Sequence, residues 1–452
     1  MPPMNVLLIS TYELGRQPFG LASPAAWLQR AGARVACLDL SVQRLDEREV
    51  RDANLIALYL PMHTATRIAV QALDKLRDWN PQAHLCAYGL YAPVNAAFLR
   101  RRGIQTILGG EFEEGLVRLV ERLRGGGGPA DPEISLARQQ FLPPRRESLP
   151  PLDSYAHLTT ATGERRTVGY TEASRGCKHL CRHCPVVPVY GGQFRIVQAD
   201  VVLDDVRRQV ELGARHITFG DPDFFNGPGH AVTIVRRLAE EHPGLSYDVT
   251  IKVEHLLRHA ELLPLLRDTG CAFVTTAVES LDDDVLARLD KGHRRADFFE
   301  LVGRCAAVGL ALQPTFIPFT PWSSVESYED LLSTLASLDM IAHVPPIQLA
   351  IRLLIPAGSR LLELGEVRDL VEGFDEAALG HRWRHADPRV DTLQRDVEAL
   401  VEDADGDAGR DATFQSIWGR LQRELDRPAP LPPTPPGRPR VTIPYLSEPW
   451  YC

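Results

Sequence analysis

Residues 173–192, ASRGCKHLCRHCPVVPVYGG, decide how the rest of the chain is interpreted. They place Cys177, Cys181 and Cys184 in a C-x3-C-x2-C spacing, directly after an apolar segment that predicts a β-strand. Three thiolates on one tight loop can hold three irons of a cubane cluster, which leaves the fourth iron open for a substrate or cofactor. The spacing therefore predicts a 4Fe–4S centre with one open iron.

Two other interpretations of these cysteines stay open. In the first, His179 or His183 completes a tetrahedral zinc site, although zinc sites usually pair two separated couples of ligands. In the second, the cysteines are unliganded core residues, which the basic and polar character of the loop disfavours. The remaining internal cysteines lie on expected strands and helices and are predicted to be small core residues: Cys37, Cys86, Cys271 and Cys305.

The segment around the loop, residues 166–360, alternates strand and helix patterns. Three of its helices are expected to stop at glycines, and Asp200 is expected to cap another helix. Six strand–helix units predict a partial (β/α)6 barrel related to the TIM barrel, with its chemistry at the carboxyl ends of the strands. The expected strand ends are Ala173, Phe219, Lys252, Ala277, Ile317 and Leu354.

Residues 1–125 predict a separate α/β unit, a doubly wound, Rossmann-like parallel sheet. Its helices are expected over residues 25–31, 68–79 and 113–123. Its expected strands are the short apolar runs Asn5–Ser10, Arg34–Leu40, Leu55–Leu60, His84–Tyr88 and Ile104–Leu108.

Three further segments complete the expected organisation. Residues 126–165 are a glycine- and proline-rich linker, and residues 361–427 form a charged helical region. Residues 428–452 are a proline-rich tail that is expected to run extended over the surface.

Composition narrows the class of protein. The chain has 452 residues and a net charge of −9, so nucleic acid is not an expected partner. It has no apolar run of about 18 residues, and its start lacks the basic flank of a signal peptide. We therefore expect a cytoplasmic protein without a membrane span, whose cysteines are thiols or metal ligands.

At the cysteine loop the chain resembles the radical S-adenosylmethionine (SAM) superfamily, and the resemblance covers about residues 166–360. In that family the open iron binds the amino and carboxylate groups of SAM. An electron from the cluster then cleaves a carbon–sulfur bond to give a carbon radical. The resemblance implies a small-molecule substrate and an electron donor such as flavodoxin or ferredoxin. His183 stands where the family often has an aromatic residue before the third cysteine.

The stretch ITFGDPDFFNG places Asp221 and Asp223 just past the second strand. It resembles the family motif that contacts the amino group of SAM, and an ammonium group needs charged acceptors. The alternative is a turn in which both carboxylates cap backbone groups.

The stretch FVTTAVESLDDDVLARLDKGH resembles the segment in which a Glu-Ser pair ends the fourth strand. The resemblance implies that Glu279, beside Ser280, accepts hydrogen bonds from the ribose of SAM. Lys252 and Arg352 are single basic residues near strand ends. Each is a candidate partner of the SAM carboxylate, and each has a solvated strand end as its alternative.

The first domain resembles the cobalamin-binding domain that precedes many radical SAM enzymes, and GGEFEEG at 109–115 looks like the turn after that domain's last strand. The Asp-x-His-x-x-Gly motif that supplies a histidine to cobalt is absent, and only His63 and His84 precede residue 150. Cobalamin is therefore a possible cofactor without a histidine ligand; the alternative is a scaffold that has lost it.

The end of the chain, SEPWYC, resembles the tails of a small radical SAM group that carry Cys-Cys-Ala-Glu-Pro, or selenocysteine at the second position. This makes Cys452 a speculative catalytic residue, and a frayed terminus is its alternative. The sequence thus predicts an enzyme that cleaves SAM reductively and modifies a small molecule. The alternatives are cobalamin-dependent methyl transfer, transfer of another SAM fragment to arsenic or a thiol, and a non-catalytic zinc or iron–sulfur protein.

Overall fold

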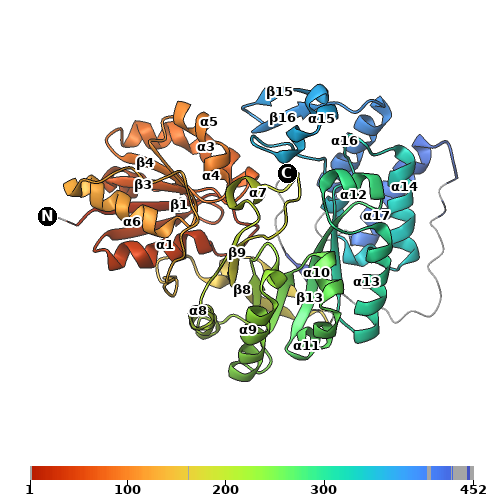
Figure 1. The fold of residues 1–452 in the computed structure, drawn as a ribbon, viewed down its shortest axis with the longest axis horizontal. Coiled ribbons are helices and arrows are strands. Elements are labelled where there is room, and N and C mark those ends of the chain that lie inside the picture. Colours follow the sequence, from red (N-terminus) through yellow and green to blue (C-terminus); the bar gives the residue numbers. More distant parts are fainter. Residues whose placement is uncertain (1–2, 161, 405–408, 429, 431–444, 448–452) are drawn as a thin grey trace.

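The computed structural model of the protein describes residues 3–160, 162–404, 409–428, 430 and 445–447. Two α/β units lie side by side, one built from the first 125 residues and the other from the barrel segment (Figure 1). Among the described residues, no helix is both long and apolar enough to cross a membrane.

The first unit is a six-stranded parallel sheet in the order β2-β1-β3-β4-β5-β6. The order reverses at β1, which is the switch point where open α/β sheets bind ligands. Its strands are β1 (Asn5–Ser10), β2 (Arg34–Asp39), β3 (Leu55–Tyr59), β4 (His84–Tyr88), β5 (Thr106–Gly110) and β6 (Ile134–Ser135). Its helices are α1 (Phe19–Arg30), α2 (Glu47–Asp52), α3 (His63–Trp79), α4 (Tyr91–Val94), α5 (Ala96–Arg101) and α6 (Glu113–Glu121).

The sequence prediction for this unit needs three corrections. Helices α1 and α3 begin about one and a half turns earlier than expected, because Phe19 and His63 continue helices whose apolar pattern starts later. The segment predicted as a linker contributes β6, which pairs with Gly109 and Gly110 at the edge of the sheet. A two-residue edge strand carries too short a pattern to be recognised in a glycine- and proline-rich stretch.

The second unit is a curved sheet in the order β14-β13-β12-β11-β8-β7-β17. Five strands run parallel: β8 (Arg165–Thr171), β11 (His216–Phe219), β12 (Ser246–Thr250), β13 (Cys271–Glu279) and β14 (Leu312–Phe316). Two short strands extend the β8 edge in antiparallel pairing, β7 (His157–Thr159) and β17 (Tyr445–Leu446). The cysteine loop is flanked by the small pair β9 (Ser174–Gly176) and β10 (Phe194–Ile196).

The partial barrel that the sequence predicts is confirmed, but its sixth strand is reduced to one parallel bridge between Phe319 and Arg352. Prolines at 345, 346 and 356 border that segment and remove the backbone donors that a longer ladder would need. The barrel helices are α7 (Val187–Tyr190), α8 (Ala199–Glu211), α9 (Pro228–Glu241), α10 (Val253–Arg258), α11 (Leu263–Asp268), α12 (Asp283–Leu289), α13 (Arg295–Val308) and α14 (Val325–Ser337).

Asp200 does not cap α8. Gln198 occupies the cap position, and its side chain instead bonds the backbone of Gln139 and Phe141. Asp200 lies in the first turn and forms an ion pair with Arg237 at 2.6 Å.

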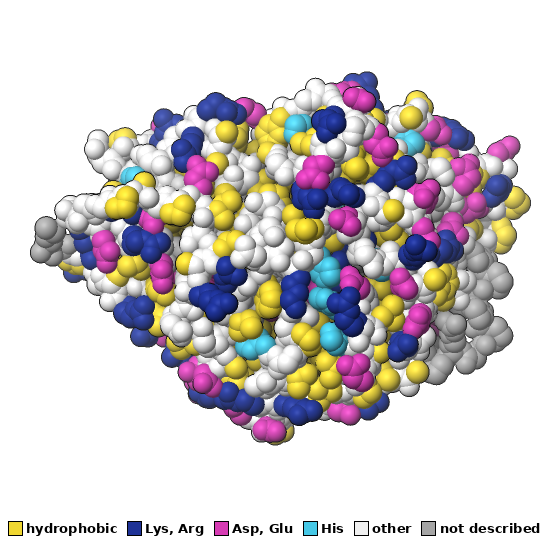
Figure 2. Space-filling view, viewed as in Figure 1, with side chains coloured by type: hydrophobic (Ala, Val, Ile, Leu, Met, Phe, Trp, Pro, Cys, Tyr) yellow, Lys and Arg dark blue, Asp and Glu magenta, His cyan; other side chains and the backbone are white. Residues whose placement is uncertain are grey.

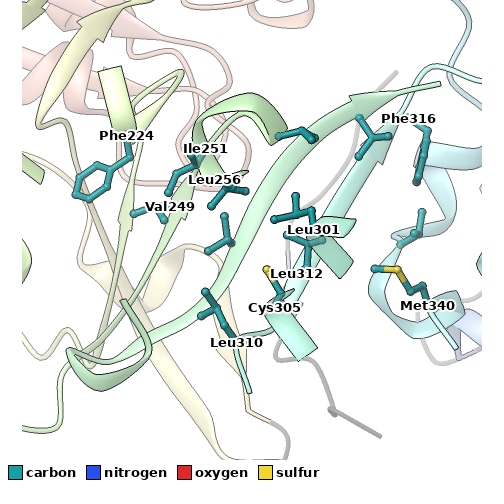
Figure 3. Packing of buried hydrophobic residues seen from close by; sticks show 14 of the residues in the cluster. Phe224, Val249, Ile251, Leu256, Leu301, Cys305, Leu310, Leu312, Phe316 and Met340 are labelled. Carbon is teal, nitrogen blue, oxygen red and sulfur yellow. The ribbon is translucent and has the colours of Figure 1, made fainter. Parts of the chain in front are cut away.

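Buried apolar side chains fill the space between the barrel strands and their helices (Figure 3). Leu301 and Cys305 of α13 pack there beside Leu312 and Phe316 of β14. The four cysteines predicted to be core residues are all buried: Cys37, Cys86, Cys271 and Cys305.

The region predicted to be helical, 361–427, also contains a β-hairpin. The hairpin pairs β15 (Val371–Asp375) with β16 (Gly380–Trp383), and the helices are α15 (Gly365–Leu370), α16 (Pro388–Glu402) and α17 (Arg410–Glu424). The charged composition of the region hid strands of only four and five residues. Cys452 lies outside the described residues.

Candidate functional site

A cavity of about 420 Å³ lies between the two units. The first sheet contributes residues just beyond the carboxyl ends of its strands, including Glu13, Pro61 and Gly89. The barrel contributes Gly220 and Thr250, at the carboxyl ends of β11 and β12. The ligand-binding edges of both folds therefore open onto the same space.

Arg175, at the start of the cysteine loop, ties the two units together. Its guanidinium is 2.7 Å from Glu113 and 3.4 Å from Glu111, both from the GGEFEEG turn, and 2.7 Å from Glu172. It also lies 5.0 Å from the centre of the Phe112 ring. Because Arg175 precedes the first cysteine by two residues, the turn predicted from sequence positions the cysteine loop.

The glutamates around Arg175 are buried, and this changes their acidity. Burial and the nearby Glu113 raise the pKa of Glu111 to about 7, against the opposing effect of Arg175. Tyr190, from the far side of the cysteine loop, donates a hydrogen bond to Glu111 at 3.1 Å. The turn therefore contacts the loop from both sides.

Cys177 and Cys181 are buried, and Cys184 is half-buried. Burial raises the pKa of Cys177 to about 11 and that of Cys184 to about 12, so iron must displace protons when it binds these thiols. The ammonium group of Lys252 lies 3.6 Å from the sulfur of Cys181. A cation at this position can pair with the negative charge of a metal-bound thiolate.

The three sulfurs do not fit a single zinc ion. Ligands on one zinc at 2.3 Å would place sulfur atoms about 3.8 Å apart, whereas these three do not all lie within 4.8 Å of one another. Neither histidine of the zinc alternative is turned to them: His179 contacts His255 and Asp223, and His183 contacts Glu279. In a cubane cluster each thiolate binds a different iron, so the three sulfurs need not surround one point.

Glu279 ends β13 in a left-handed backbone conformation, with φ of 68°. Its carboxylate receives hydrogen bonds from Lys291 at 3.1 Å and from His183 at 3.2 Å. The charges of Lys291 and His183 outweigh burial and hold the pKa of Glu279 well below its ordinary value. Backbone strain in a residue of this type is concentrated at functional sites, and here it brings a fixed negative charge beside the cysteine loop.

The structure separates the two aspartates that the sequence grouped together. Asp221 lines the cavity, and its carboxylate accepts hydrogen bonds from Ser174 and the Ala173 backbone. Burial raises the pKa of Asp221 to about 7. Asp223 instead lies against the ring of His255, with Oδ2 2.7 Å from Nδ1.

Two other candidates have structural contacts. The Ser280 hydroxyl accepts a hydrogen bond from the backbone of Asp282, which caps α12. Arg352 pairs with Asp391 at 2.6 Å and lies 3.5 Å from the centre of a Trp383 ring. Its charge is satisfied in the C-terminal region, and we do not assign it to a cofactor.

The histidines of the first unit are engaged elsewhere. His63 begins α3 and its Nε2 lies 2.6 Å from the carbonyl of Ala378, while His84 contacts the Thr106 hydroxyl at 2.8 Å. Burial lowers the pKa of both imidazoles. Neither residue lines the cavity.

Sequence reasoning missed the roles of Arg175, His179 and His255. A lone arginine or histidine carries no periodic signal, and the partners of Arg175 in the first unit lie more than 60 residues away. His179 was considered only as a zinc ligand beside the cysteines, and its contact with His255 was not expected.

The profile of the Radical SAM superfamily matches residues 171–332 of the chain. The chain is 24% identical over 330 residues to the hopanoid C-3 methylase of Methylococcus capsulatus, covering 70% of this chain and 64% of that protein. It is 29% identical over 133 residues to the bacteriochlorophyllide d C-12(1)-methyltransferase of Chlorobaculum tepidum, covering 29% of this chain and 28% of that protein. The chain thus spans less than two thirds of the length of either relative.

Two solved structures share the fold across both units. The radical enzyme OxsB, with aqua-cobalamin and SAM bound, superposes with a TM-score of 0.67 and 13% identity, covering 94% of this chain and 72% of that chain. The methyltransferase TsrM from Kitasatospora setae, with tryptophan and a SAM analogue bound, gives 0.66 and 16% identity, covering 95% and 96%. Residues 171–332 therefore match a radical SAM domain, and the chain as a whole shares the fold of OxsB and TsrM.

Proposed function

We propose that the chain is a cobalamin-dependent radical SAM methyltransferase that acts on a small polar molecule. The observation that carries the proposal is the cavity onto which the carboxyl ends of both sheets open. A methyl group must pass between a carrier on one domain and a substrate beside the cluster on the other, and a shared cavity allows that transfer. The fold shared with a cobalamin-bound enzyme over 94% of the chain supports this arrangement.

The residues around the cysteine loop would bind SAM. Glu279 remains ionised because Lys291 and His183 stabilise its charge, so it can accept hydrogen bonds from ribose hydroxyls. Asp221 offers a carboxylate to the SAM amino group, and the Lys252 ammonium beside Cys181 offers a partner to the SAM carboxylate. When bound, the cluster supplies the electron that cleaves SAM.

The first unit would hold the cobalamin. Its wall of the cavity presents apolar side chains suited to a flat macrocycle, including Tyr59, Pro61, Met62 and Leu90. Among the described residues that line the cavity there is no histidine, so the cobalt would lack a protein imidazole. Bound cobalamin would supply a metal centre that carries the methyl group.

The barrel wall of the cavity is polar, which indicates the class of substrate. Successive strands place hydroxyl and amide groups on it: Thr250, Thr275, Gln313 and Thr315. A hydrocarbon would leave these groups without hydrogen bonds, whereas a small molecule rich in donors and acceptors would satisfy them.

The test is anaerobic reconstitution with iron, sulfide and cobalamin, followed by incubation with methyl-labelled SAM and a reductant. We expect about one cobalamin per chain, and both S-adenosylhomocysteine and 5′-deoxyadenosine once a substrate is supplied. Met62→Trp, which fills the apolar wall, should reduce bound cobalamin without loss of iron. Leu123→Trp, at an exposed position, is the matched control.

The outcome that contradicts methyl transfer is 5′-deoxyadenosine without S-adenosylhomocysteine, from an enzyme that retains no cobalamin. The chain would then use the SAM-derived radical directly on its substrate.

A further inference from the structure

His179, Asp223 and His255 converge from three different segments. His179 lies between the first two cysteines of the loop, Asp223 follows β11, and His255 lies in the first turn of α10. One ligand atom from each lies within 4.8 Å of the others, and no other three His, Cys, Asp or Glu residues in the described part of the chain meet so closely. Cys177 and Cys181 are not members of this group.

The two imidazoles of the group are spaced as two ligands on one ion are. The Nε2 atoms of His179 and His255 are 3.3 Å apart, and two imidazoles bound to one tetrahedral zinc at 2.0–2.1 Å would be separated by about 3.3 Å. Asp223 Oδ2 lies 3.7 Å from His179 Nε2 and 2.7 Å from His255 Nδ1. His255 has one nitrogen toward His179 and the other toward Asp223, and an ion would take one of the two, together with His179 and Asp223.

Two atoms of the group lack the hydrogen bonds that their burial requires. Asp223 Oδ2 and His255 Nδ1 are buried without a hydrogen-bond partner, although they face each other. The other Asp223 oxygen, Oδ1, accepts a hydrogen bond from the Phe225 backbone at 3.1 Å. The Asp223 side chain is 0% exposed and that of His255 is 4% exposed. A buried carboxylate in this state is costly unless a cation neutralises it.

From these observations we propose that His179, Asp223 and His255 bind a first-row divalent transition metal ion, distinct from the iron–sulfur cluster. Two imidazoles and a carboxylate suit Zn²⁺ or Fe²⁺, whereas Mg²⁺ and Ca²⁺ prefer oxygen ligands alone. The ion joins the cysteine loop to the ends of β11 and β12. It therefore fixes the segment between Cys177 and Cys181.

The site can be reached from solvent. The side chain of His179 is 17% exposed. Histidine side chains are visible among Lys and Arg in the middle of the face shown in Figure 2, where α10 lies in Figure 1. The remaining coordination position can be filled by water from this side. The inference does not depend on cobalamin or on methyl transfer.

The test uses the full-length protein with its cluster reconstituted, equilibrated with a slight excess of Zn²⁺ and then desalted. We expect about one zinc in addition to about four irons per chain. His255→Gln and Asp223→Asn should lower zinc at least tenfold. His259→Gln is the matched control, because His259 lies beside His255 but faces Glu261.

A second measurement covers the case in which these variants lose the cluster. With all three loop cysteines changed to serine, added Co²⁺ should give weak d–d absorption without sulfur charge-transfer bands, and His255→Gln should abolish it. The inference is wrong if the reconstituted protein retains no zinc, or if zinc and Co²⁺ binding are unchanged in His255→Gln. In either case the three side chains form only a hydrogen-bonded relay.

Discussion

Replacing Arg175 with methionine should open the interface between the two units. Arg175 is 7% exposed and is surrounded by Glu111, Glu113 and Glu172, the first two of which are 0% exposed. Methionine retains much of the packing against the aromatic rings but removes the positive charge. The substitution leaves three acidic groups without their shared cation.

The size of the expected change in stability of the interface depends on whether those carboxylates stay ionised. Removing one partner of a buried ion pair costs about 3–5 kcal/mol. The pKa of Glu111 is already about 7, so this side chain takes up a proton readily when Arg175 is lost. Protonation relieves part of the repulsion between the glutamates. We therefore expect the free energy of opening the interface to fall by about 3 kcal/mol, the lower end of the range. This corresponds to a roughly 150-fold increase in the population of the open interface.

Hydrogen exchange followed by mass spectrometry measures that population. The Ala156 amide precedes β7 and is bonded to the Gly15 carbonyl of the first unit at 2.7 Å, so it should exchange about 100-fold faster in Arg175→Met. Arg145→Met is the control, because Arg145 forms an exposed pair with Glu147 and such pairs contribute about 0–1 kcal/mol. Equal exchange in the two variants would refute the conclusion that Arg175 holds the units together.

Three further predictions concern the cofactors and the interface. Glu279→Gln should weaken SAM binding by roughly tenfold or more while iron content stays unchanged, because a charge-assisted hydrogen bond contributes about 1.5–3 kcal/mol; equilibrium dialysis of the reconstituted protein measures this. Because its pKa is raised in the folded protein, Glu111 binds a proton more tightly there than in the unfolded chain. The stabilisation that this gives is fully present below about pH 4.5 and is lost as pH rises through about 7. Glu111→Gln should flatten this part of the pH dependence, and an unchanged slope between pH 4.5 and 7 would contradict the assignment. Finally, His63→Ala should leave the paramagnetic resonance spectrum of bound cobalt(II) unchanged, because His63 contacts the Ala378 carbonyl; loss of a nitrogen coupling would assign it to cobalt.

The sequence was most informative where a pattern is local. The apolar runs of the first sheet predicted β1 and β4 to the residue, because a buried parallel strand is a continuous apolar segment. The cysteine spacing located the loop that the superfamily profile also covers. Both signals lie within a few consecutive residues, so no knowledge of tertiary contacts was needed.

The sequence was less informative where function depends on contacts between distant segments. Asp221 and Asp223 were grouped because they follow the same strand, yet the turn at Pro222 directs them to different partners. One carboxylate lines the cavity, and the other lies against His255, which is 32 residues further along the chain. Spacing along a strand cannot reveal this division, because the backbone leaves the strand conformation between the two residues.

The distribution of charge gives a physical reason for joining the two units. The cysteine loop carries Lys178 and Arg182, and the buried Lys252 lies 3.6 Å from the sulfur of Cys181. A cluster with thiolate ligands would add negative charge beside Lys252. The GGEFEEG turn supplies buried carboxylates that engage Arg175 and not these cations. The first unit therefore orients the loop through one arginine, while Lys252 remains beside the sulfur of Cys181. Loss of Arg175 should thus impair the geometry of cluster assembly more than the charge around the cluster.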